Sequence, residues 1–234
     1  RSCLGEALAL HEARGKRDGM AVLSSNLGVL ETSLGNHAAA VPHYERALGL
    51  IRDLGDEPNV AVTLRNLSYS LQQLGERSSA RALAEEGISI LRRVGQRRML
   101  AASLSALADL LVAEGEPAEA RRQALEALHL AREAGEKVTL LAVLTVLGVI
   151  ALALRQEVRA ARLLGAAEAL HEALGVPLGE GERDDWAARV ADLSAKLGPE
   201  RFEALRAEGR ALPLEAALAV AEGGEAEENA RPAL

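Results

Sequence analysis

Several residue types are scarce in this sequence, and each shortage narrows what the chain can do. Cys3 is the only cysteine in 234 residues, which excludes an internal disulfide and a metal site built from several thiolates. Aromatic residues make up only 2%, so the core must consist mainly of alanine and leucine, which suits closely packed helices. Arginine outnumbers lysine 24 to three, a bias typical of bacterial genomes with a high GC content.

Basic surface is scarce as well. The formal net charge is -7, the sequence pI is about 5.4, and no run of lysine and arginine occurs. Nucleic-acid binding requires clustered positive charge, so we do not expect direct binding of nucleic acid by this segment. No signal-peptide pattern is present, and we therefore expect a cytoplasmic location. Because the chain starts with Arg1 rather than Met, we expect it to be part of a longer protein.

What the sequence does contain is a 40-residue repeat without insertions or deletions. Leu27 recurs as Leu67, Leu107 and Leu147. The units close with the glycines Gly15, Gly55, Gly95, Gly135 and Gly175. A fixed period of this size is typical of a solenoid, in which each unit buries its apolar face against its neighbours. We therefore predict an all-α solenoid of antiparallel helix pairs with C-terminal capping helices.

The repeat divides the chain into three predicted regions. Residues 1–175 form the array, with a lone second helix at 4–14 and helix pairs at 20–34/38–54, 59–74/78–94, 99–114/118–134 and 139–154/158–174. Residues 176–221 are expected to begin with a linker at 176–182 and to form capping helices at 183–197, 199–209 and 214–221. Residues 222–234 form an acidic tail that is expected to be flexible.

The segment from 139 to 154 carries no charge and could be mistaken for a membrane span. As a helix it is about 24 Å long, shorter than the roughly 30 Å of a bilayer core. It also lies in register as the first helix of the fourth pair, so we expect no contact with a membrane. A helix that is apolar all round is buried all round. We predict that the C-terminal helices cover it, with Trp186 or Phe202 among the contacts.

Patterns for catalysis or metal binding are missing. No HExxH motif occurs, and His37 and His43 are six residues apart, which does not place them on one helix face. The segment Gly179-Glu180-Gly181 lacks the completion of a phosphate loop, and Ser24, Ser25 and Ser33 have no His/Asp pattern around them. We expect no metal, no cofactor and no enzymatic activity.

The matched positions resemble a tetratricopeptide repeat. The first full unit carries the pattern in Leu27-Gly28, Gly35, Ala40, Tyr44 and Ala47, and the resemblance covers residues 1–175. Later units depart from the pattern, since the turn glycine becomes Arg155 and Tyr44 becomes Ala84. The unit is about six residues longer than the usual 34, so both helices should be extended. The resemblance implies a right-handed superhelix whose concave groove binds a protein or peptide partner.

A narrower resemblance concerns the C-terminal part. Residues 159–178 and 197–221 are similar to the end of the repeat region in bacterial ATP-dependent multidomain transcriptional regulators of the MalT/LuxR type. The resemblance implies a regulatory domain whose ATPase and DNA-binding modules lie elsewhere, because this chain has neither a Walker motif nor a helix-turn-helix.

The tetratricopeptide pattern places the partner-binding groove on the first helix of each pair. Its predicted partner-binding residues are Ser25, Asn26, Arg65, Asn66, Tyr69, Gln72 and Gln73. The resemblance implies that Asn26 and Asn66 hold the backbone of an extended peptide, although they could instead tie adjacent helices together. Arg65 is the one cation placed there, and its planar fork suits a carboxylate, so we predict an acidic residue in the peptide.

Two other functions stay open at this point. A small-molecule sensor would use an apolar pocket between the third and fourth pairs and the C-terminal helices, with Asp109 as its polar anchor. The lining of that pocket would come from Val112, Val149 and Leu152. A self-association module would instead cover the same apolar face with a second copy of the chain, as a homodimer.

Overall fold

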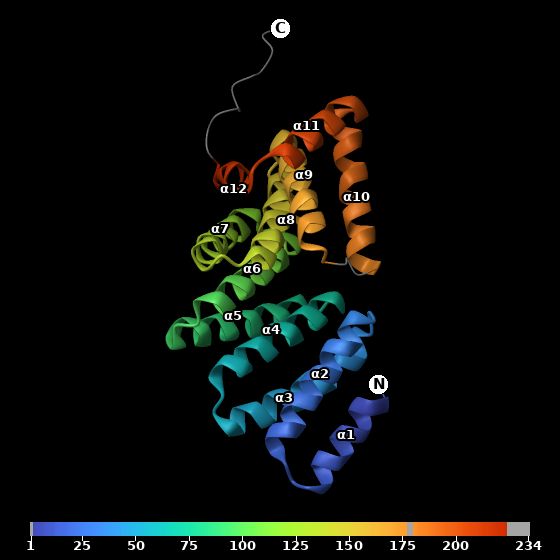
Figure 1. Ribbon diagram of the computed structural model, residues 1–234, viewed down its shortest axis with the longest axis vertical. Coiled ribbons are helices and arrows are strands. Elements are labelled where there is room, and N and C mark those ends of the chain that lie inside the picture. Colours follow the sequence, from blue (N-terminus) through green and yellow to red (C-terminus); the bar gives the residue numbers. More distant parts are fainter. Residues whose placement is uncertain (1, 177–179, 224–234) are drawn as a thin grey trace. The chain divides into compact units, whose positions relative to one another are not determined.

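The computed structural model describes residues 2–176 and 180–223, and over these residues it consists of twelve α-helices without a strand (Figure 1). The chain folds into two compact units, unit 1 over residues 1–135 and unit 2 over residues 136–234. The predicted all-α helical solenoid is confirmed. The array comprises, in the described part of the chain, one lone helix followed by four helix pairs, as the repeat predicted.

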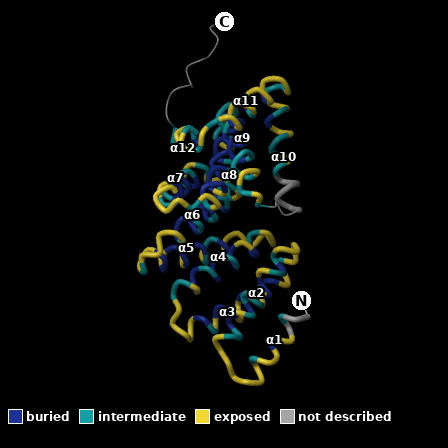
Figure 2. The backbone as a smooth tube through the Cα atoms, in the orientation of Figure 1, coloured by how far each residue is buried: buried dark blue, intermediate teal, exposed yellow. Residues whose placement is uncertain are grey.

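Unit 1 holds the lone helix α1 (Ser2–Ala13) and three pairs. In each pair the first helix is called helix A and the second helix B, and α1 occupies a helix-B position. The pairs are α2 (Arg17–Ser33) with α3 (His37–Leu54), α4 (Glu57–Gln73) with α5 (Arg77–Val94), and α6 (Arg97–Ala113) with α7 (Pro117–Ala134). Buried positions run along the facing sides of the helices, while the turns between them are exposed (Figure 2).

Left-handed backbone at the turns explains why glycine recurs in the sequence. Gly35, Gly75 and Gly115 turn the chain from helix A to helix B with φ of 74°, 84° and 82°. A side chain is strained in this region of φ/ψ space, and glycine avoids the strain. Arg155 takes the same place in the fourth pair with φ of 58°, and no other non-glycine residue in the described ranges has positive φ. The repeat pattern placed Arg155 at this turn, and the backbone confirms it.

Helix A packs on helix B through two repeat positions, one on each helix, whose side chains complement each other in size. In the first pair, a Cβ on Gly28 would lie 2.6 Å from Cε1 of the buried Tyr44 ring, so only glycine fits beneath it. In the fourth pair, a Cβ on Gly148 would lie 3.5 Å from Leu164, an ordinary contact. The middle pairs carry small residues on both helices at these buried positions, Ser68 with Ala84 and Ala108 with Ala124. In each unit, the helix-B residue at the Tyr44 position is therefore paired with a helix-A residue small enough to leave room for it.

Ion pairs join the start of helix A to the end of helix B in each pair of unit 1. Arg17 pairs with Asp53 in the first, Arg93 with Glu57 at 2.6 Å in the second, and Arg97 with Glu133 in the third. The signs are reversed in the second pair. All six side chains are largely exposed, so these contacts add little stability, although they favour the observed pairing.

Unit 2 contains the fourth pair, α8 (Lys137–Ala153) with α9 (Glu157–Leu174), and three further helices. These are α10 (Glu180–Leu197), α11 (Pro199–Ala211) and α12 (Leu214–Glu222). Helix α10 begins three residues before the predicted residue 183. Residues 177–179 of the predicted linker and 224–234 of the predicted tail lie outside the described residues. No helix in the described ranges is long and apolar enough to cross a membrane.

The C-terminal helices cover the fourth pair mainly from the α9 side. Helix α11 packs along α9, α10 contacts both α9 and α11, and α12 contacts α8 and α9. Trp186 is half-buried and its Nε1 donates to Glu168 Oε1 of α9 at 3.0 Å, while Phe202 of α11 is fully buried. The predicted C-terminal cap is present. It packs mainly against α9, whereas the prediction placed its main contact on residues 139–154, which belong to α8. Helix α9 carries the longest contact because α11 takes the place beside it that a further helix A would fill.

The crossing of α9 and α11 depends on two glycines. A Cβ on Gly165 would lie 2.1 Å from the backbone oxygen of Arg206, and a Cβ on Gly209 would lie 2.0 Å from that of Arg162. The two backbones are therefore in direct contact. Glu168, only 11% exposed, accepts hydrogen bonds beside this crossing from Trp186 and from Arg206 at 2.8 Å.

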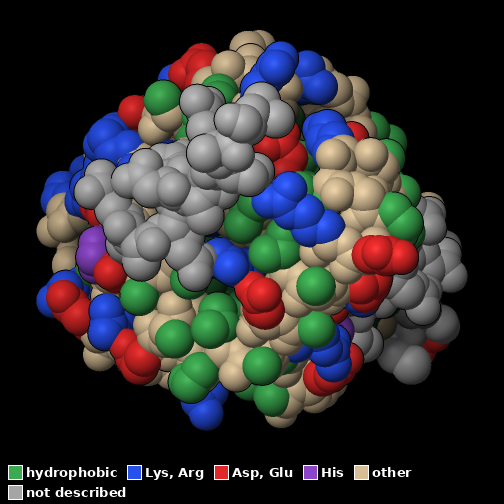
Figure 3. Space-filling view, turned by 90° about the horizontal axis from the view of Figure 1, so that it is seen from above, with side chains coloured by type: hydrophobic (Ala, Val, Ile, Leu, Met, Phe, Trp, Pro, Cys, Tyr) green, Lys and Arg blue, Asp and Glu red, His purple; other side chains and the backbone are tan. Residues whose placement is uncertain are grey.

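Figure 3 shows one face of the molecule, where acidic and basic side chains are interspersed.

Candidate interaction face on helices α2 and α4

The helices A of unit 1 lie side by side. Helix α4 contacts α2 and α6 as well as its own partner α5, so residues at the same repeat position on α2 and α4 form neighbouring rows. Asn26 and Asn66 are one such row, and Val29 and Tyr69 are another. Residues three, four and seven apart share one side of a helix. We define the helix-A face as Val22, Ser25, Asn26, Val29, Arg65, Asn66, Tyr69, Gln72 and Gln73.

Every predicted groove residue reaches the surface at least in part. Asn26 and Gln73 are exposed, Tyr69 is 39% exposed, and Ser25, Arg65, Asn66 and Gln72 are half-buried. Two apolar side chains of α2 flank the polar pair Ser25 and Asn26, Val22 at 60% and Val29 at 48% exposure. The face thus combines amides, one guanidinium and exposed apolar surface. Val22 was not predicted, although its spacing of four from Asn26 and seven from Val29 could have identified it.

Arg65 is the electrostatic centre of this face. Its guanidinium donates to Asn66 Oδ1 at 3.4 Å, a long hydrogen bond, and it forms no ion pair with a carboxylate within the described chain. Burial lowers the pKa of Arg65, an effect that the nearby Tyr44 hydroxyl partly opposes. A guanidinium stays charged at physiological pH despite such a shift. The face therefore contains a partly desolvated positive charge without a negative partner.

Polar contacts fix the floor of the face. Thr32 Oγ1 lies 3.1 Å from the Tyr44 hydroxyl and 3.3 Å from Ser70 Oγ, which links α2, α3 and α4. Burial raises the pKa of Tyr44, so the phenol is neutral at physiological pH. The ring of Tyr69 meets His37 edge to face, with centroids 5.7 Å apart. Burial lowers the pKa of His37, which favours the neutral imidazole in this contact. Sequence reasoning missed His37 as the support of Tyr69 because the contact joins separate repeats.

Gln72 and Asp109 were predicted for two different sites, and the structure bonds them to each other. Gln72 Nε2 donates to Asp109 Oδ2 at 3.1 Å, which ties α4 to α6. The remaining residues of the predicted small-molecule pocket are half-buried, Val112 on α6 and Val149 and Leu152 on α8. Because α6 belongs to unit 1 and α8 to unit 2, that pocket stays a prediction. No group of three His, Cys, Asp or Glu suited to a metal ion occurs among the described residues.

Comparison with known proteins agrees with this architecture. Residues 19–93 match one family profile described as tetratricopeptide repeat, and residues 100–134 match a second with the same description. Helices α2 to α7 carry tetratricopeptide repeats. No curated protein matches the sequence significantly. Such repeats are generally non-catalytic modules of protein–protein interaction.

Solved structures match over most of the chain. The crystal structure of BtubC (BKLC) from P. vanneervenii is 19% identical with a TM-score of 0.63, and the match covers 94% of this chain and 85% of that one. A Podospora anserina protein described as "putative kinesin light chain nearly identical TPR-like repeats" is 20% identical with a TM-score of 0.57. That match covers 82% of this chain and 93% of the other. Identities this low establish a shared fold and nothing further.

Proposed function

We propose that this chain is a non-catalytic protein-interaction domain that binds an extended peptide segment of a partner across the helix-A face of α2 and α4. The observation that carries the proposal is the half-buried Arg65 guanidinium without a carboxylate partner. Removing a charge from water costs free energy unless a partner compensates it. A ligand carboxylate would supply that compensation through a charge-assisted and potentially bidentate hydrogen bond.

The surroundings of Arg65 suit a peptide. Asn26 is exposed and Asn66, at the same repeat position of α4, is half-buried, and an amide side chain can both donate to and accept from a peptide backbone. Val22, Val29 and Tyr69 offer apolar surface for the side chains of the same peptide. Aromatic and arginine side chains are enriched among the residues that dominate binding energies at interfaces. We therefore expect the peptide to carry an acidic residue at Arg65 and apolar residues on either side of it.

The experiment is selection from a random peptide library with the full chain, followed by titration of the selected peptides. Acidic residues should be enriched at one position. The Arg65→Gln variant should weaken binding by about 1–3 kcal/mol, because a charged partner loses its hydrogen bonds. Asn66→Ala should weaken binding by a similar amount. Arg77→Gln, at the start of α5, provides a matched control, since Arg77 is an exposed arginine of a helix B.

Undiminished binding by folded Arg65→Gln and Asn66→Ala variants would contradict the proposal and move the site to another face. Circular dichroism should show unchanged helix content in both variants, because neither residue belongs to the core.

The sequence resemblance extends the proposal to the parent protein. We infer that the domain belongs to a larger bacterial transcriptional regulator of the cytoplasm, in which other modules carry the ATPase and DNA-binding functions. This inference rests on residues 159–178 and 197–221, and the coding sequence on either side of this segment tests it. Small-molecule sensing and homodimerisation stay as alternatives. Analytical ultracentrifugation of the full chain would detect the homodimer.

A further inference from the structure

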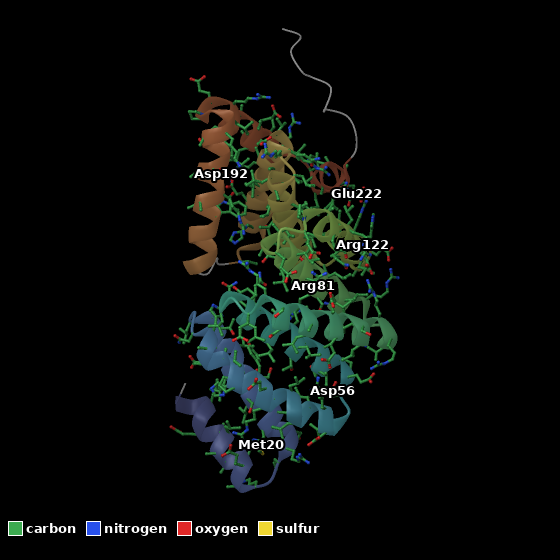
Figure 4. The ribbon with its side chains drawn as sticks, turned by 180° about the vertical axis from the view of Figure 1, so that it is seen from behind. Met20, Asp56, Arg81, Arg122, Asp192 and Glu222 are labelled. Atoms are coloured by element: carbon green, nitrogen blue, oxygen red, sulfur yellow. The ribbon has the colours of Figure 1, made fainter. Side chains whose placement is uncertain are left out.

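A cleft on the helix-B side of unit 1 is separate from the proposed peptide site. It lies between α5 and α7 above α6 and has a volume of about 330 Å³. Pockets that hold small molecules begin at about 300 Å³. Its lining includes Arg81 and Glu85 of α5 and Arg122 and Gln123 of α7. Figure 4 labels Arg81 and Arg122, one on each of the two helices that form its walls.

The inner part of the cleft is apolar. Ile88 of α5 and Leu107 and Leu111 of α6 are each at most 4% exposed. These three side chains can accept a short aliphatic group. A group of this kind gains roughly 0.8 kcal/mol for each buried methylene.

One deep polar atom has no partner. Gln123 is 6% exposed, and its amide nitrogen donates to Glu119 Oε1 at 2.6 Å. Its Oε1 is buried and accepts no hydrogen bond. A buried acceptor without a donor is costly, so a ligand N–H or O–H at this position would be stabilising. The short contact to Glu119 also fixes which amide atom is the nitrogen, because a carbonyl oxygen cannot donate to a carboxylate.

The rim carries both guanidinium and carboxylate groups. Arg81, Arg92 and Arg122 stand against the carboxylates of Glu85 and Glu119. Hydrogen bonds from Arg122 and Gln123 lower the pKa of Glu119 to about 2, so its carboxylate is ionised at neutral pH. Each of these arginines already forms ion pairs. Arg81 pairs with three carboxylates, those of Glu85, Glu114 and Glu116. Arg92 pairs with Glu126, and Arg122 pairs with Glu119. Arg92 and Arg122 are also largely exposed, so both can turn towards an added anion.

We propose that this cleft is a binding site for a small aliphatic α-amino acid. The aliphatic side chain would lie against Ile88, Leu107 and Leu111, the ammonium group would donate to Gln123 Oε1, and the carboxylate would reach the arginines of the rim. This site goes beyond the proposed peptide-binding function, because it uses α5, α6 and α7 and none of the residues of the helix-A face.

The test is calorimetric titration of the full chain with leucine and two analogues that share its aliphatic body. The analogue 4-methylpentanoate lacks the ammonium group, and 3-methylbutylamine lacks the carboxylate. Leucine should bind with a saturable isotherm, and each analogue should bind about tenfold more weakly, since each loses one polar contact. A 4-methylpentanoate affinity equal to that of leucine would overturn the role of Gln123 Oε1.

A variant separates the role of Gln123 from its effect on folding. Gln123→Leu keeps the volume and removes both the unpartnered acceptor and the hydrogen bond to Glu119, two opposing effects, so it should fold about as stably as the wild type and bind leucine about tenfold more weakly. Gln96→Leu is the control, because Gln96 is exposed at the start of α6 and its side chain makes no capping hydrogen bond. Absence of leucine binding to the wild type, or equal binding to the folded Gln123→Leu variant, would overturn the proposal.

Discussion

At the scale of single residues, the repeat pattern shows which positions hold a different residue type from the same position in the other units. The position that holds Leu64, Leu104 and Leu144 in later units holds Ser24 in the first. Ser24 is fully buried, and its hydroxyl has no hydrogen-bond partner. We expect Ser24→Ala to raise the free energy of unfolding by about 1 kcal/mol, because the desolvated hydroxyl is removed.

A second serine provides the contrast. Ser68 is also buried, but its hydroxyl donates to the backbone oxygen of Ala80 at 2.7 Å. Ser68→Ala should therefore lower the free energy of unfolding by about 1 kcal/mol. Chemical denaturation of the two variants checks the opposite signs, and equal effects would show that the Ser24 hydroxyl has a partner in solution.

Arg155 provides the other residue-scale prediction. It is the non-glycine residue with φ of 58° at the turn between α8 and α9, where the other pairs have glycine. Arg155→Gly should stabilise the protein by about 1 kcal/mol, because glycine takes this conformation without steric strain. Thermal unfolding measures the change, and a loss of stability would show that the Arg155 side chain makes a contact that outweighs the strain.

At the scale of helix pairs, the match between Gly28 and Tyr44 decides how α2 packs on α3. Gly28→Ala should destabilise the protein by about 1–3 kcal/mol, because the new Cβ would overlap the tyrosine ring. In a Tyr44→Ala background, the same change should stabilise by up to about 1 kcal/mol, the helix propensity of alanine over glycine. A double-mutant cycle measures this change of sign. Gly49→Ala is the control, since a Cβ at Gly49 would meet no atom within 4 Å.

The crossing of α9 and α11 tests the cap in the same way. Gly165→Ala should cost at least about 1–3 kcal/mol in the stability of unit 2, because its Cβ would overlap a backbone atom of α11 that cannot rotate away. Gly148→Ala in α8 is the matched control with ordinary contact distances, and it should be neutral or stabilising. Hydrogen exchange of the amides in α9 and α11 would locate the loss. Unchanged protection in Gly165→Ala would contradict this close contact.

At the scale of the whole molecule, the sequence predicted the helices well and the contacts between distant segments poorly. Leucines and glycines every 40 residues were sufficient for the nine helices of the array, because period and turn residues are local signals. The support of the cap by α9 was not predictable, since it depends on Gly165 meeting a backbone 41 residues further along, at Arg206.

For the helix-A face, too, contacts between distant segments could not be predicted from the sequence. The positions of Asn26, Arg65 and Tyr69 follow from the repeat, but whether a carboxylate lies beside Arg65 depends on how side chains of neighbouring helices pack. The bond between Gln72 and Asp109 likewise joins neighbouring repeats. The binding role of this face remains a proposal, and the structure supports it through one unpaired guanidinium.

The most direct test of that proposal is a double-mutant cycle between Arg65 and the acidic residue of a selected peptide. Affinities would be measured for the wild type and Arg65→Gln, each with the acidic peptide and with its Glu→Gln or Asp→Asn counterpart. We predict a coupling energy of about 1.5 kcal/mol or more, as for close charge pairs at an interface. A coupling energy near zero, with binding retained, would show that Arg65 does not contact the acidic residue and would contradict the proposed site.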